Sequence, residues 1–106
     1  MITMFKFEYV KHHTVPLKDT FKSTKIEVSH CGDKYVSADG LNTIALNDVG
    51  KLIDGTTMFL TENDPRKFIE AIVRKTEENI SFHKKYIDDM IQRKTKWEYW
   101  LLDHKE

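Results

Sequence analysis

The chain has 106 residues, in which 17 Lys and Arg balance 17 Asp and Glu. This length bounds the protein to one domain, with an extension at most. The even charge argues against a simple electrostatic nucleic-acid binder, because such proteins concentrate Lys and Arg and reach a basic pI. Residues 1–63 carry seven Lys and eight acidic residues, and residues 64–106 carry ten basic and nine acidic residues, so neither half is a basic module.

Short apolar runs and a low cysteine content indicate the compartment. Lys6 and Glu8 interrupt the first apolar segment, so the sequence predicts no signal peptide. No apolar run approaches the roughly 20 residues that a membrane-spanning helix needs. A lone cysteine, Cys31, cannot form an internal disulfide, whereas small secreted domains usually carry several. We therefore expect a cytoplasmic protein.

The N-terminal part of the chain is predicted to be all-β. All four glycines lie within the first 55 residues, where they separate short β-rich segments. Residues 2–10 place Phe5, Phe7 and Tyr9 at a period of two, which is typical of a half-buried strand. Val15-Pro16 then ends this strand.

Further short strands follow. Residues 25–30 and 34–37 predict a hairpin around the turn Cys31-Gly32-Asp33. Residues 41–46 and 57–60 predict two more strands, separated by a helical turn that Asn47-Asp48 can cap. Four or five strands joined by tight turns predict a small antiparallel β-sheet or an SH3-like barrel over residues 1–62.

Residues 63–106 are predicted to form a long amphipathic helix, which makes the fold class α+β. Asp64 can cap the helix and precedes Pro65, a residue suited to the first helical position. No Gly or Pro follows Pro65, so nothing obvious ends the helix over about 40 residues, or roughly 60 Å. The alternative is a break near Asn79 or Ser81 that returns the remaining residues as a helical hairpin.

Apolar residues recur along this helix with spacings of four and three, as in a coiled-coil seam. The positions are Ile69, Val73, Thr76, Ile80, His83, Ile87, Met90, Lys94, Trp97 and Leu101. The β-branched residues among them favour a two-stranded assembly. We therefore predict a homodimerisation segment that uses Ile80, Ile87, Met90, Trp97 and Leu101.

Polar and flanking residues leave a second interpretation of this seam open. Thr76, His83 and Lys94 interrupt it, and they either set its register or show that no seam exists. Ile72, Tyr86 and Trp100 widen the apolar stripe, which favours packing on a broader surface.

Residues suited to catalysis or metal binding are present but poorly spaced. Imidazole, thiolate and carboxylate groups suit zinc. Adjacent residues on a strand, however, point to opposite faces, so each adjacent pair can offer only one ligand to a common metal ion. These groups belong to His12, His13, His30, Cys31 and Asp33. No phosphate-binding glycine motif occurs, and the i,i+4 charge pairs of the helix are typical of a solvated face. We predict no catalytic residue, metal or cofactor, and no enzymatic activity.

Two sets of residues near the C-terminus predict interactions. Large aromatic side chains at a chain end need burial, and Trp and Tyr dominate protein interfaces, so Trp97, Tyr99 and Trp100 are the predicted partner contacts. Basic residues interleaved with aromatic ones can also follow phosphates and stack on bases. That alternative, a small nucleic-acid-binding regulator, would use Lys84, Lys85, Arg93, Lys94 and Lys96.

The overall architecture adds a resemblance. Glycine-punctuated strands lead through Met58-Phe59-Leu60-Thr61-Glu62-Asn63-Asp64-Pro65 directly into an uninterrupted helix. In size and architecture the chain resembles small accessory proteins of bacteriophages and mobile elements, a class that includes inhibitors of host defence such as anti-CRISPR proteins. The resemblance implies a non-enzymatic protein in the host cytoplasm that binds a protein complex. Many such inhibitors are strongly acidic, so this neutral chain is expected to occlude a protein surface or lock a conformation.

Overall fold

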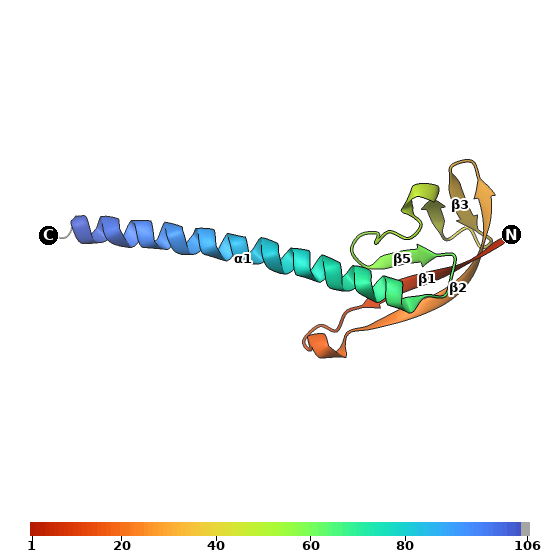
Figure 1. Ribbon diagram of the computed structural model, residues 1–106, viewed down its shortest axis with the longest axis horizontal. Helices are drawn as coiled ribbons and strands as arrows, with labels where there is room; N and C mark the ends of the chain where they lie inside the picture. The colour runs from red at the N-terminus through yellow and green to blue at the C-terminus, as the bar shows by residue number, and fades with distance from the viewer. Residues whose placement is uncertain (105–106) are drawn as a thin grey trace. The chain divides into compact units, whose positions relative to one another are not determined.

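Within residues 1–104, which the computed structural model describes, the chain forms a β-sheet followed by one long helix. Five antiparallel strands lie in the order β4-β3-β2-β1-β5 and curl into a half-barrel (Figure 1). The strands are β1 (Ile2–Val10), β2 (Thr20–Cys31), β3 (Lys34–Ser37), β4 (Thr43–Ala45) and β5 (Thr57–Leu60), and the helix is α1 (Pro65–Asp103). The predicted α+β class is confirmed, with an open sheet whose edges are β4 and β5.

The chain divides into two compact units, and the division falls inside α1. The sheet unit, Met1–Val73, holds all the strands and the first turns of α1. The helical unit begins at Arg74 and contains the rest of α1. No helix in residues 1–104 is both long enough and apolar enough to cross a membrane.

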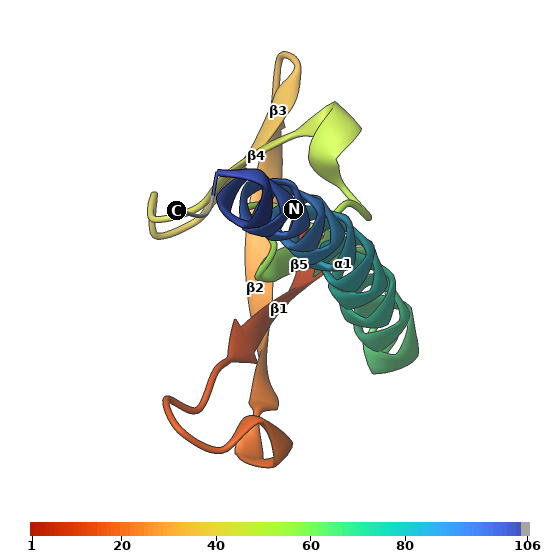
Figure 2. The same ribbon diagram turned by 90° about the vertical axis from the view of Figure 1, so that its left-hand side faces the viewer.

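β1 and β2 form the longest strand pair of the sheet (Figure 2). Their register runs from Ile2 opposite Val28 to Val10 opposite Thr20, which confirms the predicted bounds of β1. β2 begins before the predicted strand at residue 25, because residues 20–24 pair with β1 although their own sequence alternates weakly. A short 3-10 turn, η1 (Pro16–Lys18), joins the two strands where Val15-Pro16 was expected to end β1.

Tight turns connect the remaining strands. Gly32, at φ +65°, opens the two-residue turn of the predicted β2–β3 hairpin, a place where glycine avoids the steric cost of positive φ. β4 is shorter than the predicted strand 41–46, because the chain enters a 3-10 turn, η2 (Leu46–Asp48), at its end. Asn47 and Asp48 lie inside that turn, which follows Ala45 and has no side-chain cap, so the prediction that they cap a helical turn is wrong.

Apolar side chains are buried on both faces of the sheet. Successive strand residues point to opposite faces, so Met4 and Phe7 on β1 belong to different clusters. One cluster consists of Met4, Val28, Ile44 and Phe59. The other consists of Phe7, Met58, Leu60 and Phe68, the last of which is contributed by α1. Phe5 and Tyr9 pack against this second cluster, as the predicted half-buried face of β1 requires.

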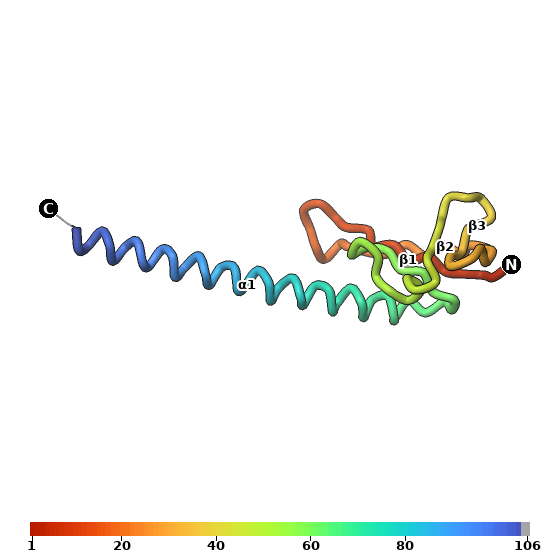
Figure 3. The backbone as a smooth tube through the Cα atoms, turned by 90° about the horizontal axis from the view of Figure 1, so that it is seen from above, coloured from red at the N-terminus to blue at the C-terminus, as the bar shows by residue number. Residues whose placement is uncertain are grey.

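The first turns of α1 belong to the second cluster. Pro65 is the first helical residue, and the Lys67 backbone N–H donates to Asp64 Oδ1 at 3.4 Å, as expected for a capping carboxylate. Phe68 is fully buried, with its ring 5.6 Å from Phe7 and 6.0 Å from Phe21 between centroids. The helix then continues unbroken to Asp103, so the predicted continuous helix is confirmed and the hairpin alternative is wrong (Figure 3).

Candidate functional site

The residues considered for metal binding do not converge. Within residues 1–104, no group of three or more His, Cys, Asp and Glu side chains is placed to hold a metal ion. His12 Nδ1 accepts a hydrogen bond from the Val15 backbone N–H at 3.0 Å, inside the β1–β2 connection. His30 packs against the Tyr35 ring at 5.6 Å, and Cys31 is exposed at the end of β2.

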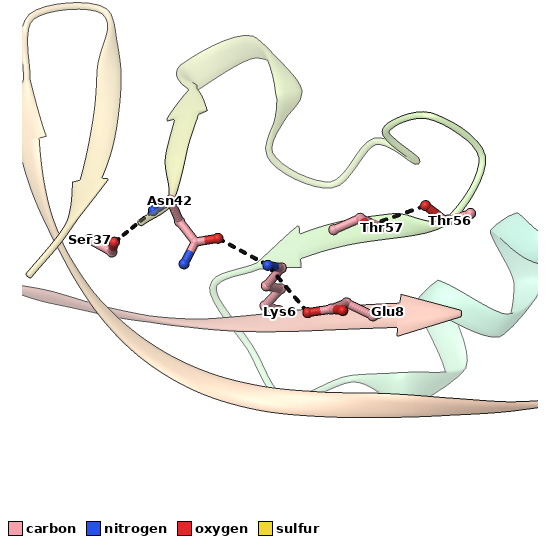
Figure 4. Close-up of polar contacts among 6 residues, drawn as sticks. All are labelled: Lys6, Glu8, Ser37, Asn42, Thr56 and Thr57. Atoms are coloured by element: carbon pink, nitrogen blue, oxygen red, sulfur yellow. Dashed lines mark hydrogen bonds and ion pairs between the residues drawn. The ribbon is translucent and has the colours of Figure 1, made fainter. Parts of the chain in front are cut away.

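A polar network on the sheet ties β1 to the β3–β4 connection (Figure 4). Lys6 Nζ donates to Asn42 Oδ1 at 3.0 Å and lies 3.2 Å from Glu8 Oε1. The Asn42 backbone N–H donates to Ser37 Oγ at 2.9 Å, and Ser37 Oγ donates to Asp39 Oδ1 at 2.5 Å. Because these groups are engaged with one another, the network holds the sheet together and is a poor starting point for chemistry.

Two carboxyl groups of the sheet unit are stabilised in their charged form. The hydroxyl of Ser37 and the backbone N–H of Leu41 lower the pKa of Asp39. The Tyr9 hydroxyl donates to Asp19, which lowers the pKa of Asp19 and raises that of Tyr9. Asp19 also accepts a hydrogen bond from the His12 backbone N–H at 2.7 Å. The hydrogen bonds of Asp19 with Tyr9 and His12 therefore stabilise the connection between β1 and β2.

The most unusual surface of the protein is the helical unit. From Ile80 to Leu102 every large apolar side chain of α1 is 49% exposed or more. They are Ile80, Phe82, Tyr86, Ile87, Met90, Ile91, Trp97, Tyr99, Trp100, Leu101 and Leu102. Scattered exposed apolar residues are ordinary, but a contiguous stripe marks an interaction site. The members of this set that share one broad side of α1 form such a stripe, and this stripe is the candidate functional site.

The predicted dimerisation residues lie within this stripe at consistent helical spacing. We call the row Thr76, Ile80, His83, Ile87, Met90, Lys94, Trp97 and Leu101 the α1 seam. A shallow depression on the helix surface is lined by Thr76, Asn79, Ile80, His83, Lys84, Ile87 and Asp88. Ile91 also faces this side, beside Met90, and the sequence prediction omitted it because the four-and-three spacing passes over it.

The aromatic residues at the end of α1 do not share one face. At about 100° per residue, Trp97 and Trp100 lie on neighbouring parts of the helix surface, whereas Tyr99 lies on the opposite side. The Trp100 ring stacks on His104 at 4.1 Å, and Lys96 Nζ lies 5.3 Å from the Trp97 ring centroid. Tyr99 lines a separate depression with Thr95, Glu98 and Leu102.

The basic residues of the nucleic-acid alternative are distributed around the helix. At about 100° per residue, Lys94 lies within the α1 seam, Lys84 and Arg93 flank it on its two sides, and Lys85 and Lys96 lie on the other side of the helix. Lys94 Nζ is 3.1 Å from Glu98 Oε1, and Arg66 Nε is 3.1 Å from Glu70 Oε1, so acidic residues of the same helix offset part of its positive charge. The helix therefore brings together no single face of positive charge from these residues.

Comparisons with protein-family models, with curated proteins and with solved structures found no match for this chain.

Proposed function

We propose that this protein acts by binding another protein through the helical unit, without catalysing a reaction. The observation that supports this is the run of eleven large apolar side chains between Ile80 and Leu102, all at least 49% exposed. Full burial of one such side chain contributes about 1.5–3 kcal/mol, while association costs roughly 4–15 kcal/mol. Because each of these side chains is already partly covered, its burial gains only part of that energy, so a partner must cover most of them to bind stably.

The proposal extends to the class of protein. A small neutral chain whose exposed surface is apolar and aromatic suits an inhibitor or adaptor that binds stoichiometrically, like those that bacteriophages and mobile elements encode. Anti-CRISPR proteins belong to that class. Such an inhibitor would act in the host cytoplasm by covering a surface of a defence complex or by locking one of its conformations. The balanced charge and the dispersed basic residues favour a protein partner over nucleic acid.

Trp97 and Trp100 provide both the proposed contact and its reporter. They are the only two tryptophans in the sequence, so the intrinsic tryptophan fluorescence comes from this end of α1. Both are about half exposed, at 58% and 49%. A protein partner that covers them should shift their emission to shorter wavelength, because the indole rings would leave water.

The test uses the immobilised full-length chain as bait in a bacterial lysate, followed by titration of the purified captured protein. We expect W97A/W100A to weaken that binding at least tenfold, and S81A/Q92A, a matched change at two polar helix positions, to leave it unchanged. Y99A measures how much the side of α1 opposite Trp97 contributes to partner binding. Equal binding by W97A/W100A would refute the assignment, and capture that is lost on nuclease treatment or in moderate salt would indicate nucleic acid instead.

A further inference from the structure

We propose that the α1 seam pairs with the α1 seam of a second copy of this chain, as a parallel, in-register, two-stranded coiled coil. The seam has two alternating kinds of position. The a positions of the α1 seam are Ile80, Ile87, Lys94 and Leu101, and its d positions are Thr76, His83, Met90 and Trp97; Val73 is the a position that directly precedes the seam. The proposal concerns self-association and its orientation; it does not rest on the protein partner proposed above, which would compete with the second copy for Trp97.

The depression on the helix surface has the residue composition of two coiled-coil holes. In parallel coiled coils each a or d side chain enters a hole made by four residues of the facing helix. The hole that receives an a side chain at Ile80 consists of Thr76, Asn79, Ile80 and His83, and the hole at His83 consists of Ile80, His83, Lys84 and Ile87. All six of these residues line the depression, and Asp88 is the one additional residue.

The residues at the a positions favour two parallel strands. β-Branched side chains occupy three successive a positions, Val73, Ile80 and Ile87, which is the preference of parallel dimers. Lys94 follows as a single charged a residue, and such a residue fixes register and oligomeric state at a cost in stability. Its ammonium group lies 3.1 Å from Glu98 of the same chain, so two copies of Lys94 would bring their counterions into the shared layer.

The residues that flank the seam favour the parallel orientation over the antiparallel one. In the parallel arrangement Arg93 faces Glu98 of the second copy, and Tyr86 faces Ile91, so one pair is oppositely charged and one is apolar. In the antiparallel register that overlaps the whole α1 seam, Thr76 would lie opposite Leu101, so Glu77 would face Glu98 and Lys84 would face Ile91. Charge complementarity therefore points to the parallel dimer.

The surface available along this side of α1 is large enough for a stable dimer. Nine large apolar side chains along it are each 49–64% exposed, namely Val73, Ile80, Tyr86, Ile87, Met90, Ile91, Trp97, Trp100 and Leu101. At roughly 100 Å² each, two copies could bury at most about 1,800 Å², within the range of specific interfaces. Pairing would also stabilise the helical unit, because amphipathic helices owe most of their stability to packing.

The first test measures the mass of the full-length chain by light scattering after size-exclusion chromatography. We expect a dimer whose helical circular dichroism falls on dilution. I80E/I87E places charges in two a layers and should give a monomer. S81E/Q92E adds the same charge at positions outside the a and d rows of the same helix and should remain dimeric. A monomeric wild-type chain at about 100 µM, a trimer, or a dimer that survives I80E/I87E would overturn the proposal.

The second test determines orientation with engineered cysteines in a C31S background. In the parallel dimer L101C lies opposite L101C, at a separation that a disulfide can bridge, so mild oxidation should link the two chains fully. In the whole-seam antiparallel register Leu101 would lie opposite Thr76, so the two cysteines would be roughly 38 Å apart. Q92C, which lies away from the seam, serves as the control that should stay reduced. A dimer that leaves L101C unlinked would overturn the parallel arrangement.

These outcomes are separable from the proposed function. A monomer that still binds a protein partner through Trp97 and Trp100 would refute the coiled coil and leave the proposed function intact. If the chain forms a parallel dimer and no protein partner shifts its tryptophan emission, the coiled coil would stand and the proposed function would be refuted. The oligomeric mass of W97A/W100A, measured beside its binding, shows which of the two interactions that variant has lost.

Discussion

α1 uses the same kind of sequence in two different ways along its length. In the sheet unit Phe68 is fully buried and stacks on Phe7, whereas Phe82, farther along the same helix, is 69% exposed. Both residues lie in helix without a break, so helix formation does not distinguish them. The difference is that sheet residues cover the first turns. An amphipathic pattern therefore records where apolar surface lies, while the fold decides which part of that surface an external partner must cover.

The largest effect that tests this comparison is expected from F68A. Removal of a buried aromatic side chain typically costs about 3–5 kcal/mol, because transfer energy and packing around the cavity are both lost. Phe68 also contacts Phe21 at 6.0 Å between centroids, so the truncation would disturb a three-ring cluster. We expect the free energy of unfolding of the sheet unit, measured by urea titration, to fall by that amount.

F82A is the matched control within the same helix. Because its ring is largely in water, with the neighbouring His83 ring at 5.7 Å between centroids, we expect a change within about 0.5 kcal/mol. A loss of similar size in both variants would contradict the comparison, since it would mean that Phe82 is buried in solution. In that event the surface around Phe82 would itself belong to an interface.

The parts of this fold that sequence predicted best are those set by local chemistry. β1, the β2–β3 hairpin at Gly32 and the helix start at Pro65 each follow from residues that lie within the element or its turn. The continuous helix likewise followed from the absence of Gly and Pro after Pro65. Each of these features depends on side-chain alternation or backbone freedom, which neighbouring residues determine.

The parts that sequence did not predict depend on residues far apart in the chain. The early start of β2 comes from pairing with β1, and Phe21 joins Phe7 and Phe68 only because that pairing places it there. The candidate site differs in this respect. Spacing predicted the positions of the α1 seam, and the same 100° per residue places Tyr99 on the opposite side from Trp97, so the error of grouping Trp97, Tyr99 and Trp100 as one contact was avoidable from the sequence.

A smaller effect is expected from H83L, which tests whether the exposed part of α1 is covered by self-association. Leucine at a d position beside β-branched a residues is the preferred pattern of two-stranded coiled coils. Replacing the polar imidazole should therefore tighten self-association about tenfold, or about 1.4 kcal/mol. Sedimentation equilibrium measures this constant, and K85L, which adds leucine away from the seam, should leave it unchanged. Weaker association in H83L would exclude this position from the seam.

The smallest expected effect concerns pH, and it should be confined to the sheet unit. Hydrogen bonds from Ser37 and from the Leu41 backbone lower the pKa of Asp39 in the folded chain. A lowered folded pKa contributes stability above the unfolded pKa of about 3.9, and this contribution is lost as pH falls through the folded pKa. D39N should therefore be less stable than wild type at pH 7, and the difference should shrink as pH falls below the unfolded pKa.

Urea unfolding followed by circular dichroism from pH 7 to pH 2 measures the two profiles, and D39N should show the shallower decline. Asparagine retains an oxygen that can accept from Ser37 and Leu41, so the comparison isolates the negative charge. Light scattering at pH 7 should give the same mass for both proteins, because Asp39 lies outside α1. Parallel pH profiles would show that Asp39 contributes nothing through its charge. A change in mass would show instead that the sheet unit takes part in self-association, and the contrast between the two parts of α1 would then need revision.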